Sequence, residues 1–267
     1  MASCRNRSYF INLRVILLLL IHNCRLHAAV LTYDGCMSDS ANSYKVGGWC
    51  FLVYSNSSMT TKTLTQAGAQ TVCGPMGNLA VGVTYKMLEK YKTQYLSASV
   101  KMAWLPLVRN ASSGWAWKTL MPRGNYAVFP AIMANIPSAA NEMNDGGVEN
   151  AAVAYYSMGI SDLENDLSIY ASTPIAVICQ FAPLLWKYLQ RGHGLFKVPA
   201  YLIAQANVTR AGCFRQCHRS PFCISMAFNP TTNDCQTYGV SPEDPRFSGN
   251  VTANSAYDWH IRDGMEY

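Results

Sequence analysis

The sequence predicts an exported α+β protein built from two disulfide-bonded domains. Three observations support this prediction: a basic and then apolar N-terminus, short helical patterns interspersed with short strand patterns, and an even set of cysteines in two separate groups. Hydrophobic residues make up 50% of the chain and charged residues 13%. These values are typical of globular proteins and argue against a highly solvated, disordered chain.

Residues 1–29 have the composition of a secretory signal peptide. Its basic residues are Arg5, Arg7 and Arg14, and its apolar run is Val15 to Ile21. Ala28-Ala29 provide the small residues expected at the cleavage site. The run is too short to cross a membrane as a helix, and an uncleaved signal anchor is the alternative interpretation. We therefore expect a secreted, extracellular protein without a membrane span.

Removal of the signal peptide changes the charge of the chain. The formal net charge of +6 includes four arginines before residue 30 and no acid in that stretch, so the mature chain carries +6 − 4 = +2. Those arginines are Arg5, Arg7, Arg14 and Arg25. A charge this small does not support a nucleic-acid partner, because binding to nucleic acid depends on neutralising phosphates.

Eight cysteines remain after Cys4 and Cys24 leave with the signal peptide, and an even set in an exported protein predicts four disulfides. They are Cys36, Cys50, Cys73, Cys179, Cys213, Cys217, Cys223 and Cys235. Four N-x-S/T sequons in the mature chain are consistent with passage through the secretory route and predict a glycoprotein. They lie at Asn56, Asn110, Asn207 and Asn250.

The spacing of the cysteines divides the mature chain into two domains. The first four are widely spaced, whereas the last four lie within 23 residues. We place the first domain at residues 30–181, a linker at 182–195 and the second domain at 196–267. The tripeptide Gly192-His193-Gly194 in the linker is expected to act as a flexible joint.

The first domain alternates between helical and strand patterns. Strands are expected around Trp49 to Val53, Met102 to Leu107, Trp115 to Lys118 and Ala151 to Tyr156, because short apolar and aromatic runs follow turn residues there. Helices are expected from Thr65, as N-cap, to Cys73, and from Tyr85 to Leu96, where apolar residues recur at spacings of three and four. The stretch 121–150 has little regular pattern, and loops of that length are usually functional.

The second domain has a simpler pattern of elements. We expect a strand at 198–204, a helix at 211–217 with Cys213 and Cys217 on one face, a strand at 222–228, a turn at 229–234 and a final strand around Trp259.

Five oxygen-bearing side chains lie in two clusters about fifteen residues apart between residues 142 and 166. They are Glu142, Asn144, Glu149, Asn165 and Asp166. Carboxylates combined with amide carbonyls are the ligands that a hard cation such as calcium takes, at six to eight oxygens per ion. They form a calcium site only if the two clusters converge.

Five motifs follow one another in the first domain: Gly48-Trp49-Cys50, Ala67 to Leu79, Ala103-Trp104-Leu105-Pro106-Leu107, Trp115-Ala116-Trp117, and Ala176 to Phe181 with its closing cysteine. Their order resembles that of the C-type lectin-like domain. The resemblance spans about 145 residues and implies an α+β fold with two helices, small antiparallel sheets and a long loop region. It also implies the disulfides Cys36–Cys50 and Cys73–Cys179. Where the family usually has a further disulfide, Ala151 and Ile169 stand here, and the joint absence of both cysteines is consistent with the resemblance.

In sugar-binding members of that family, an E-P-N or Q-P-D triplet, a following acid and the N-D of a W-N-D triplet bind one calcium ion. The residues here that match the metal ligands are Glu142, Asn144, Glu149, Asn165 and Asp166. Of these, Glu142, Asn144, Glu149 and Asn165 match the residues that also hydrogen-bond to the sugar. The E-x-N version resembles the one that takes equatorial hydroxyl pairs, as in mannose, N-acetylglucosamine and fucose.

Two departures bear on this carry-over. Met143 replaces the proline that follows a cis peptide bond in the family, and a non-proline cis bond costs about 2.5–4 kcal/mol. Either calcium binding offsets that cost, or the bond is trans and the site is altered. Glu164 stands where the family has Trp, and an alternative register through Ile136-Pro137-Ser138 would leave the site inactive. The alternative function is therefore a metal-independent protein-interaction or adhesion protein with a lectin-like fold.

The second domain resembles the apple or PAN module over residues 196–262. The resemblance rests on the C-x3-C helix, the strand cysteine Cys223 and the C-x-T-Y segment from Cys235. It implies the disulfides Cys213–Cys235 and Cys217–Cys223. Related modules bind proteins or carbohydrate, so a protein partner is expected here in addition to glycans or glycoproteins.

Other side chains give no sign of catalysis. The histidines His193, His218 and His260 lack metal-binding spacing, and no Ser or Cys nucleophile has an evident partner. Trp49, Trp104, Trp115 and Trp117 are expected to be core aromatics. We therefore expect a recognition protein rather than an enzyme.

Overall fold

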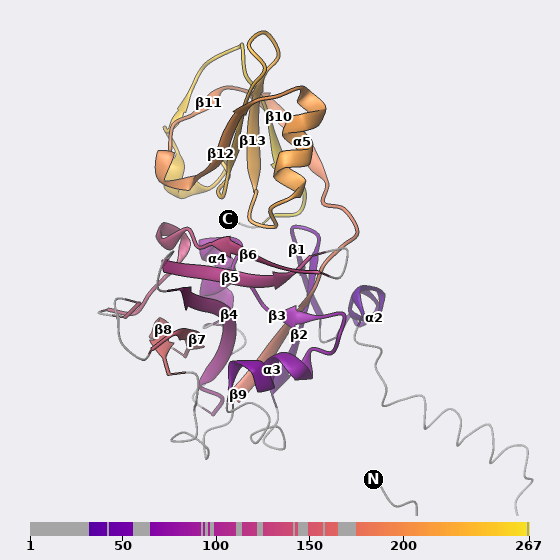
Figure 1. Cartoon of the computed structure of the whole chain (residues 1–267), viewed down its shortest axis with the longest axis vertical. Helices are drawn as coiled ribbons and strands as arrows, with labels where there is room; N and C mark the ends of the chain where they lie inside the picture. The colour runs from indigo at the N-terminus through magenta and orange to yellow at the C-terminus, as the bar shows by residue number, and fades with distance from the viewer. Residues whose placement is uncertain are drawn as a thin grey trace, which may run out of the picture.

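The computed structural model shows two domains, one stacked on the other (Figure 1). It describes residues 32–41, 43–55, 65–91, 93, 96, 99–110, 114–121, 125–140, 142–143, 149–156, 158–164, 175–265 and 267. The expected signal peptide and the sequon at Asn56 lie outside these residues.

One sheet organises the N-terminal domain. Its main path runs β1-β2-β9-β4-β5-β6, while β3 pairs with β9, and β7 pairs with β4 and β8. The neighbours are antiparallel except β4 and β9, which are parallel. The strands are β1 Ser43–Val46, β2 Trp49–Ser55, β3 Asn78–Leu79, β4 Met102–Asn110, β5 Gly114–Leu120, β6 Tyr126–Pro130, β7 Ala151–Tyr155, β8 Gly159–Leu163 and β9 Ile175–Phe181.

Strand β9 lies at the centre of this sheet, and each of its seven residues is buried. Because side chains alternate across a strand, Ala176 and Ile178 pack into one hydrophobic cluster while Ile175, Val177 and Cys179 pack into another on the opposite face. The polar exception, Gln180, is satisfied: its carbonyl accepts the N–H of Val81, and its amide donates to the Thr119 hydroxyl. Burial on both faces explains the nearly continuous apolar sequence of this strand.

Three short helices of this domain begin at threonine caps. They are α2 Tyr33–Ser38, α3 Gln66–Val72 and α4 Tyr85–Lys90. The hydroxyls of Thr32, Thr65 and Thr84 accept the N–H three residues further on, at 3.1, 3.0 and 3.2 Å. Each such cap is worth about 1 kcal/mol. The N-cap expected at Thr65 is confirmed. The α-helical part of the helix expected at 85–96 ends at Lys90, and Tyr91 and Thr93 beyond it are in π-helical conformation.

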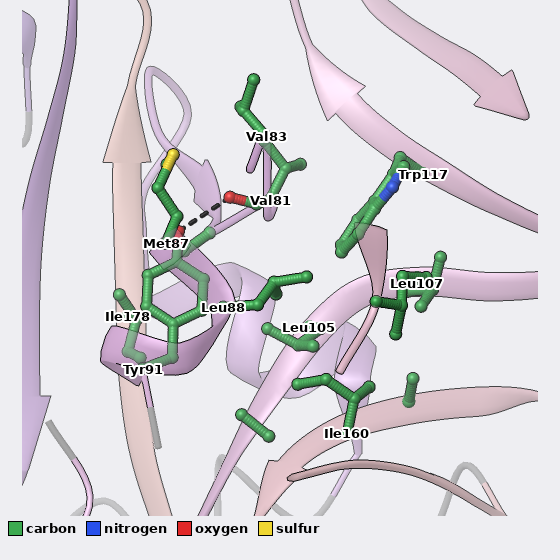
Figure 2. Packing of buried hydrophobic residues seen from close by; sticks show 14 of the residues in the cluster. Val81, Val83, Met87, Leu88, Tyr91, Leu105, Leu107, Trp117, Ile160 and Ile178 are labelled. Atoms are coloured by element: carbon green, nitrogen blue, oxygen red, sulfur yellow. Dashed lines mark hydrogen bonds between the residues drawn. The ribbon is translucent and has the colours of Figure 1, made fainter. Parts of the chain in front are cut away.

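Helix α4 packs onto the sheet through the apolar side chains of Met87, Leu88 and Tyr91 (Figure 2). The buried Tyr91 hydroxyl donates to the backbone carbonyl of Val81 at 2.7 Å, which is the dashed line in Figure 2. The four tryptophans predicted as core residues are at most 7% exposed, so that prediction is confirmed.

Both disulfides implied for the first domain are present. Cys36–Cys50 joins α2 to β2, and Cys73–Cys179 joins the C-cap of α3 to β9. The second bridge spans 106 residues. A loop of that length corresponds to about 4.7 kcal/mol of stabilisation in the chain-entropy description. This bridge ties the end of α3 to the central strand.

The second domain is built on a five-stranded antiparallel sheet in the order β10-β16-β13-β14-β12, with one helix against it. Its disulfides, Cys213–Cys235 and Cys217–Cys223, are those implied by the resemblance, and both start from α5. The elements are β10 Tyr188–His193, β11 Leu195–Phe196, β12 Leu202–Asn207, α5 Arg210–His218, β13 Ser225–Asn229, β14 Asp234–Tyr238, β15 Val251–Thr252 and β16 Asp258–Arg262.

The linker expected at 182–195 is shorter in the structure. Strand β10 pairs with β16 from Tyr188 onwards, so the connecting segment is 182–187. Gly192 does not act as a joint: a Cβ there would lie 3.0 Å from Nε1 of Trp259, so the glycine lets the two strands close around that ring. The strand expected at 198–204 also begins later, because Pro199–Tyr201 form a 3-10 turn before β12.

The two domains share a continuous apolar core. Phe222 of the second domain stacks on Trp117 of β5 with ring centroids 5.8 Å apart and meets Phe129 of β6 edge-on at 5.6 Å. The buried Asn135 adds a polar link, because its amide donates to the Gly239 carbonyl at 2.9 Å while its carbonyl accepts from Arg246 at 3.3 Å. The interface therefore holds the domains in one orientation.

Within the described residues, none of the helices is long and apolar enough to cross a membrane.

Replacement of Phe222 tests the shared core. Phe222→Ala removes a buried ring between two aromatic partners, so we expect the free energy of unfolding to fall by about 3 kcal/mol. Urea denaturation with the disulfides intact measures it. Met76→Ala is the control, because this side chain is 56% exposed and its loss should change stability by less than about 0.5 kcal/mol. A similarly small effect of Phe222→Ala would contradict a shared core.

Candidate functional site

The structure describes two of the five predicted calcium ligands. Glu142 and Glu149 are partly exposed, whereas Asn144, Asn165 and Asp166 lie outside the described residues. Described residues on either side of these ligands are held by hydrogen bonds: Glu142 bonds to Ala139, Met143 to Asp162, and Ala151 pairs with Leu163. These contacts place the described ends of the two segments relative to β8.

The segment that leads to Glu142 lies along strand β8. Ser138 bridges Ile160 in parallel orientation. The N–H of Ile160 donates to Pro137 and that of Ala139 donates back to Ile160, both at 3.0 Å. Gly159 permits this contact, because its φ is 125° and a Cβ would lie 2.6 Å from the Pro137 carbonyl oxygen. The proline of the alternative register, Pro137, is therefore engaged at the start of β8.

Met143 is held at the far end of β8 by a buried carboxylate. Its N–H donates to Oδ1 of Asp162 at 2.6 Å. Asp162 is 2% exposed and Met143 9% exposed. A hydrogen bond to a charged group of this kind is worth about 1.5–3 kcal/mol. Proline has no N–H to donate, so this anchor exists only because another residue stands at position 143.

The backbone at Met143 differs from the cis arrangement that the resemblance implies. Met143 has φ 62°, in the left-handed region, and no peptide bond between described residues is cis. The Glu142–Met143 bond is therefore trans. The family's cis arrangement is replaced by a left-handed residue whose side chain packs into the core of the domain.

The second cluster begins beside the same strand end. Ala151 pairs with Leu163, the last residue of β8, and the Asn150 carbonyl accepts the N–H of Arg109 at 2.9 Å. Glu149 thus lies just before β7. Strand β8, which pairs with β7, is followed in sequence by Glu164, Asn165 and Asp166. Both ligand-bearing segments run to the C-terminal end of β8.

The chemistry of this donor set fits a hard cation better than a soft one. The predicted ligands are carboxylates and amides, with no sulfur or imidazole among them, and calcium prefers such oxygens. Among the residues that the structure describes, no three His, Cys, Asp or Glu side chains gather to hold a metal. Glu142 and Glu149 each have an interaction partner already. An ion would therefore need the three remaining ligands to complete its shell.

Asp162, which holds the backbone beside the candidate site, is not among the site residues predicted from sequence. It stands in the run Gly159-Ile160-Ser161-Asp162-Leu163, where a charged residue within a buried strand is unusual. The charged residue in this buried strand, three positions before Asn165, is a signal that the sequence contains. Its partner Met143 lies 19 positions away, and no local pattern connects the two.

Comparisons with known proteins cover both domains. Residues 191–259 match the PAN domain family. No curated protein is significantly similar in sequence to the chain. Among solved structures, the mouse scavenger receptor C-type lectin carbohydrate-recognition domain is 13% identical with a TM-score of 0.36, covering 54% of this chain and 97% of that one.

Two further solved structures give similar values. The human scavenger receptor C-type lectin carbohydrate-recognition domain is 13% identical with a TM-score of 0.32, covering 55% of this chain and 100% of that one. Ovocleidin-17, a major protein of the Gallus gallus eggshell calcified layer, is 14% identical with a TM-score of 0.35, covering 54% and 99%.

Introducing the family's proline tests the anchor at position 143. Met143→Pro removes the N–H that Asp162 accepts and forces φ to about −65° where the backbone needs a positive value. We expect the free energy of unfolding to fall by about 3 kcal/mol or more. Met143→Leu keeps the N–H and the buried volume, so it should cost less than about 1.5 kcal/mol. Equal stability of the proline variant and the parent in chemical denaturation would show that the bond to Asp162 does not hold this loop.

Proposed function

We propose that this chain, in which a C-type lectin-like fold precedes a PAN domain, is a secreted recognition protein that binds glycans through a calcium ion at the C-terminal end of β8. The observation that carries the proposal is the anchoring of Met143 to Asp162. It places the Glu142 segment beside the strand that leads directly to Asn165 and Asp166. A site assembled from distant segments needs such an anchor to converge.

The proposed chemistry follows from the ligand types. Calcium takes six to eight oxygens, so five oxygens from protein side chains leave one to three positions, enough for two oxygens from another molecule at a coordination number of seven or eight. Vicinal hydroxyls of a sugar fit that position. Glu142, Asn144, Glu149 and Asn165 would both coordinate the ion and hydrogen-bond to these hydroxyls. The E-x-N pattern favours equatorial pairs, as in mannose, N-acetylglucosamine and fucose.

A trans bond at Glu142–Met143 supports a second candidate function. Carbonyl groups on either side of position 143 point differently in a trans and a cis chain. A loop held in that state without an ion would leave a lectin-like fold that recognises protein and not sugar. The two candidates share the same fold and differ in whether calcium binds.

Secretion and glycosylation are part of the proposal. Four disulfides support an oxidising compartment, in which such bonds form and persist. The side chains of Asn207 and Asn250 are exposed, so both are accessible to a modifying enzyme. We propose recognition without catalysis, because no nucleophile and base were identified in the sequence.

Calcium addition tests the metal site. An ion that binds only the native state stabilises it by RT ln(1 + [L]/Kd), which is about 2.7 kcal/mol at a hundredfold excess over Kd. We expect the melting temperature to rise in millimolar calcium and to return to its calcium-free value when a chelator is added. The rise should disappear in Glu142→Gln and Glu149→Gln. It should persist in Glu164→Gln, a matched control for an exposed acid beside the site. Unchanged melting of the parent chain in calcium would overturn the proposal and favour the metal-independent alternative.

Retention on immobilised sugars tests the proposed specificity. We expect the chain to bind mannose resin in calcium, to elute with a chelator, and to pass through galactose resin, because the E-x-N pattern resembles the equatorial-hydroxyl version. Glu142→Gln should abolish retention, and Glu164→Gln should not. Retention on mannose that survives both the chelator and Glu142→Gln would show that the sugar binds elsewhere.

A further inference from the structure

A groove of about 580 Å3 lies between the two domains, away from the candidate calcium site. One wall comes from β6 and the residues before it, and includes Phe129. The opposite wall comes from the end of α5, with Arg215 and Arg219. The connecting segment closes the groove with Leu184, Leu185 and Trp186.

The connecting segment exposes two consecutive large apolar side chains. Leu184 is 86% exposed and Leu185 73% exposed, although the next residue, Trp186, is buried. Single exposed hydrophobic residues are ordinary, but apolar groups gathered at a concave surface mark interaction sites. Here the leucines stand beside a groove whose floor includes Trp186. Burying them against a partner would remove apolar surface from water.

The wall formed by α5 carries positive charge without compensation. Arg215 and Arg219 are four residues apart, so they lie on the same face of the helix. Both are exposed, and within the described part of the chain neither forms an ion pair. No acid is found among the described residues that line the groove. Burial, reinforced by nearby Arg262, lowers the pKa of His218, so this ring is neutral at pH 7 and the charge comes from the two arginines.

The helix dipole explains part of this arrangement. Basic residues are favoured in the last turn of a helix because the C-terminal end of the dipole is negative. That effect accounts for cations at the end of α5. It does not account for the two exposed leucines of a different segment on the same groove.

We propose that this groove is a docking site for an acidic protein segment that carries apolar side chains. The negative charge of such a segment complements the two arginines, and the apolar side chains of the segment would cover Leu184 and Leu185. A groove can contact a narrow peptide chain from both walls, whereas a flat bilayer would contact only the rim of the groove. The groove therefore fits a peptide segment better than a membrane surface. This function is separate from the calcium-dependent site and does not require it.

A designed peptide tests the proposal on the full mature chain. The probe is a fluorescein-labelled ten-residue peptide of alternating Asp and Leu. Its binding is measured by fluorescence polarisation in the presence of EDTA. We expect binding that weakens as salt is raised, since exposed charges are screened. Arg215→Ala with Arg219→Ala should weaken it about tenfold or more, and so should Leu184→Ser with Leu185→Ser.

Matched controls distinguish binding in the groove from non-specific electrostatic or hydrophobic binding. Arg191→Ala removes an exposed arginine on β10, and Leu189→Ser replaces an exposed leucine on the same strand, so neither should change binding. A peptide of alternating Lys and Leu should not bind. Because the four substituted groove residues are exposed, all variants should keep the melting temperature of the parent.

Three outcomes would overturn the docking site: no binding of the Asp-Leu peptide, equal binding by the groove variants and the parent, or equal binding of the Lys-Leu peptide. Cosedimentation with phosphatidylcholine vesicles containing phosphatidylserine completes the test. Vesicle binding that depends on the leucine pair, without peptide binding, would identify a membrane surface as the occupant instead. EDTA keeps the result independent of the proposed calcium site.

Discussion

The first domain depends on the burial of strand β9. This strand pairs with β2 along its length, with β3 through Cys179 and Gln180, and with β4 through its first two residues. Its alternate side chains fill two separate apolar clusters, so a single strand joins both halves of the core. Cys73–Cys179 fixes α3 to it. The candidate site is built on strands β7 and β8, which reach β9 through β4.

The long stretch after β5 is divided between two tasks. Its first part, through Phe129 and Asn135, packs against the PAN domain, while its later part, at Met143, is anchored to Asp162. Pairing of residues 137–139 with β8 joins the two parts. The segment that carries the proposed ligands is therefore hydrogen-bonded to β8 both before Glu142 and at Met143. The second domain packs against the first part of this stretch through Phe222 and Gly239.

Local chemistry made much of this fold predictable from sequence. The Thr65 cap follows from nearby residues, the core tryptophans from their size and apolar character, and the cysteine set from the oxidising compartment, while the family resemblance supplied the disulfide pairing. Tertiary contacts produced the differences. Glycine usually marks flexibility, so the sequence predicts a joint at Gly192-His193-Gly194, whereas the missing side chain of Gly192 allows close packing against Trp259. Likewise, nothing in the sequence predicts that Met143 adopts a positive φ, since methionine rarely does so, or that Phe222 fills a core shared by both domains.

Direct counting of bound calcium tests the central claim, that two distant segments converge at the end of β8 to form one metal site. Equilibrium dialysis of the mature chain against radioactive calcium gives the number of ions per molecule. The account predicts one ion for the parent chain and for Glu164→Gln, and none for the double variant Glu142→Gln with Glu149→Gln. No bound ion in the parent, or one ion retained by the double variant, would contradict convergence of these residues on calcium.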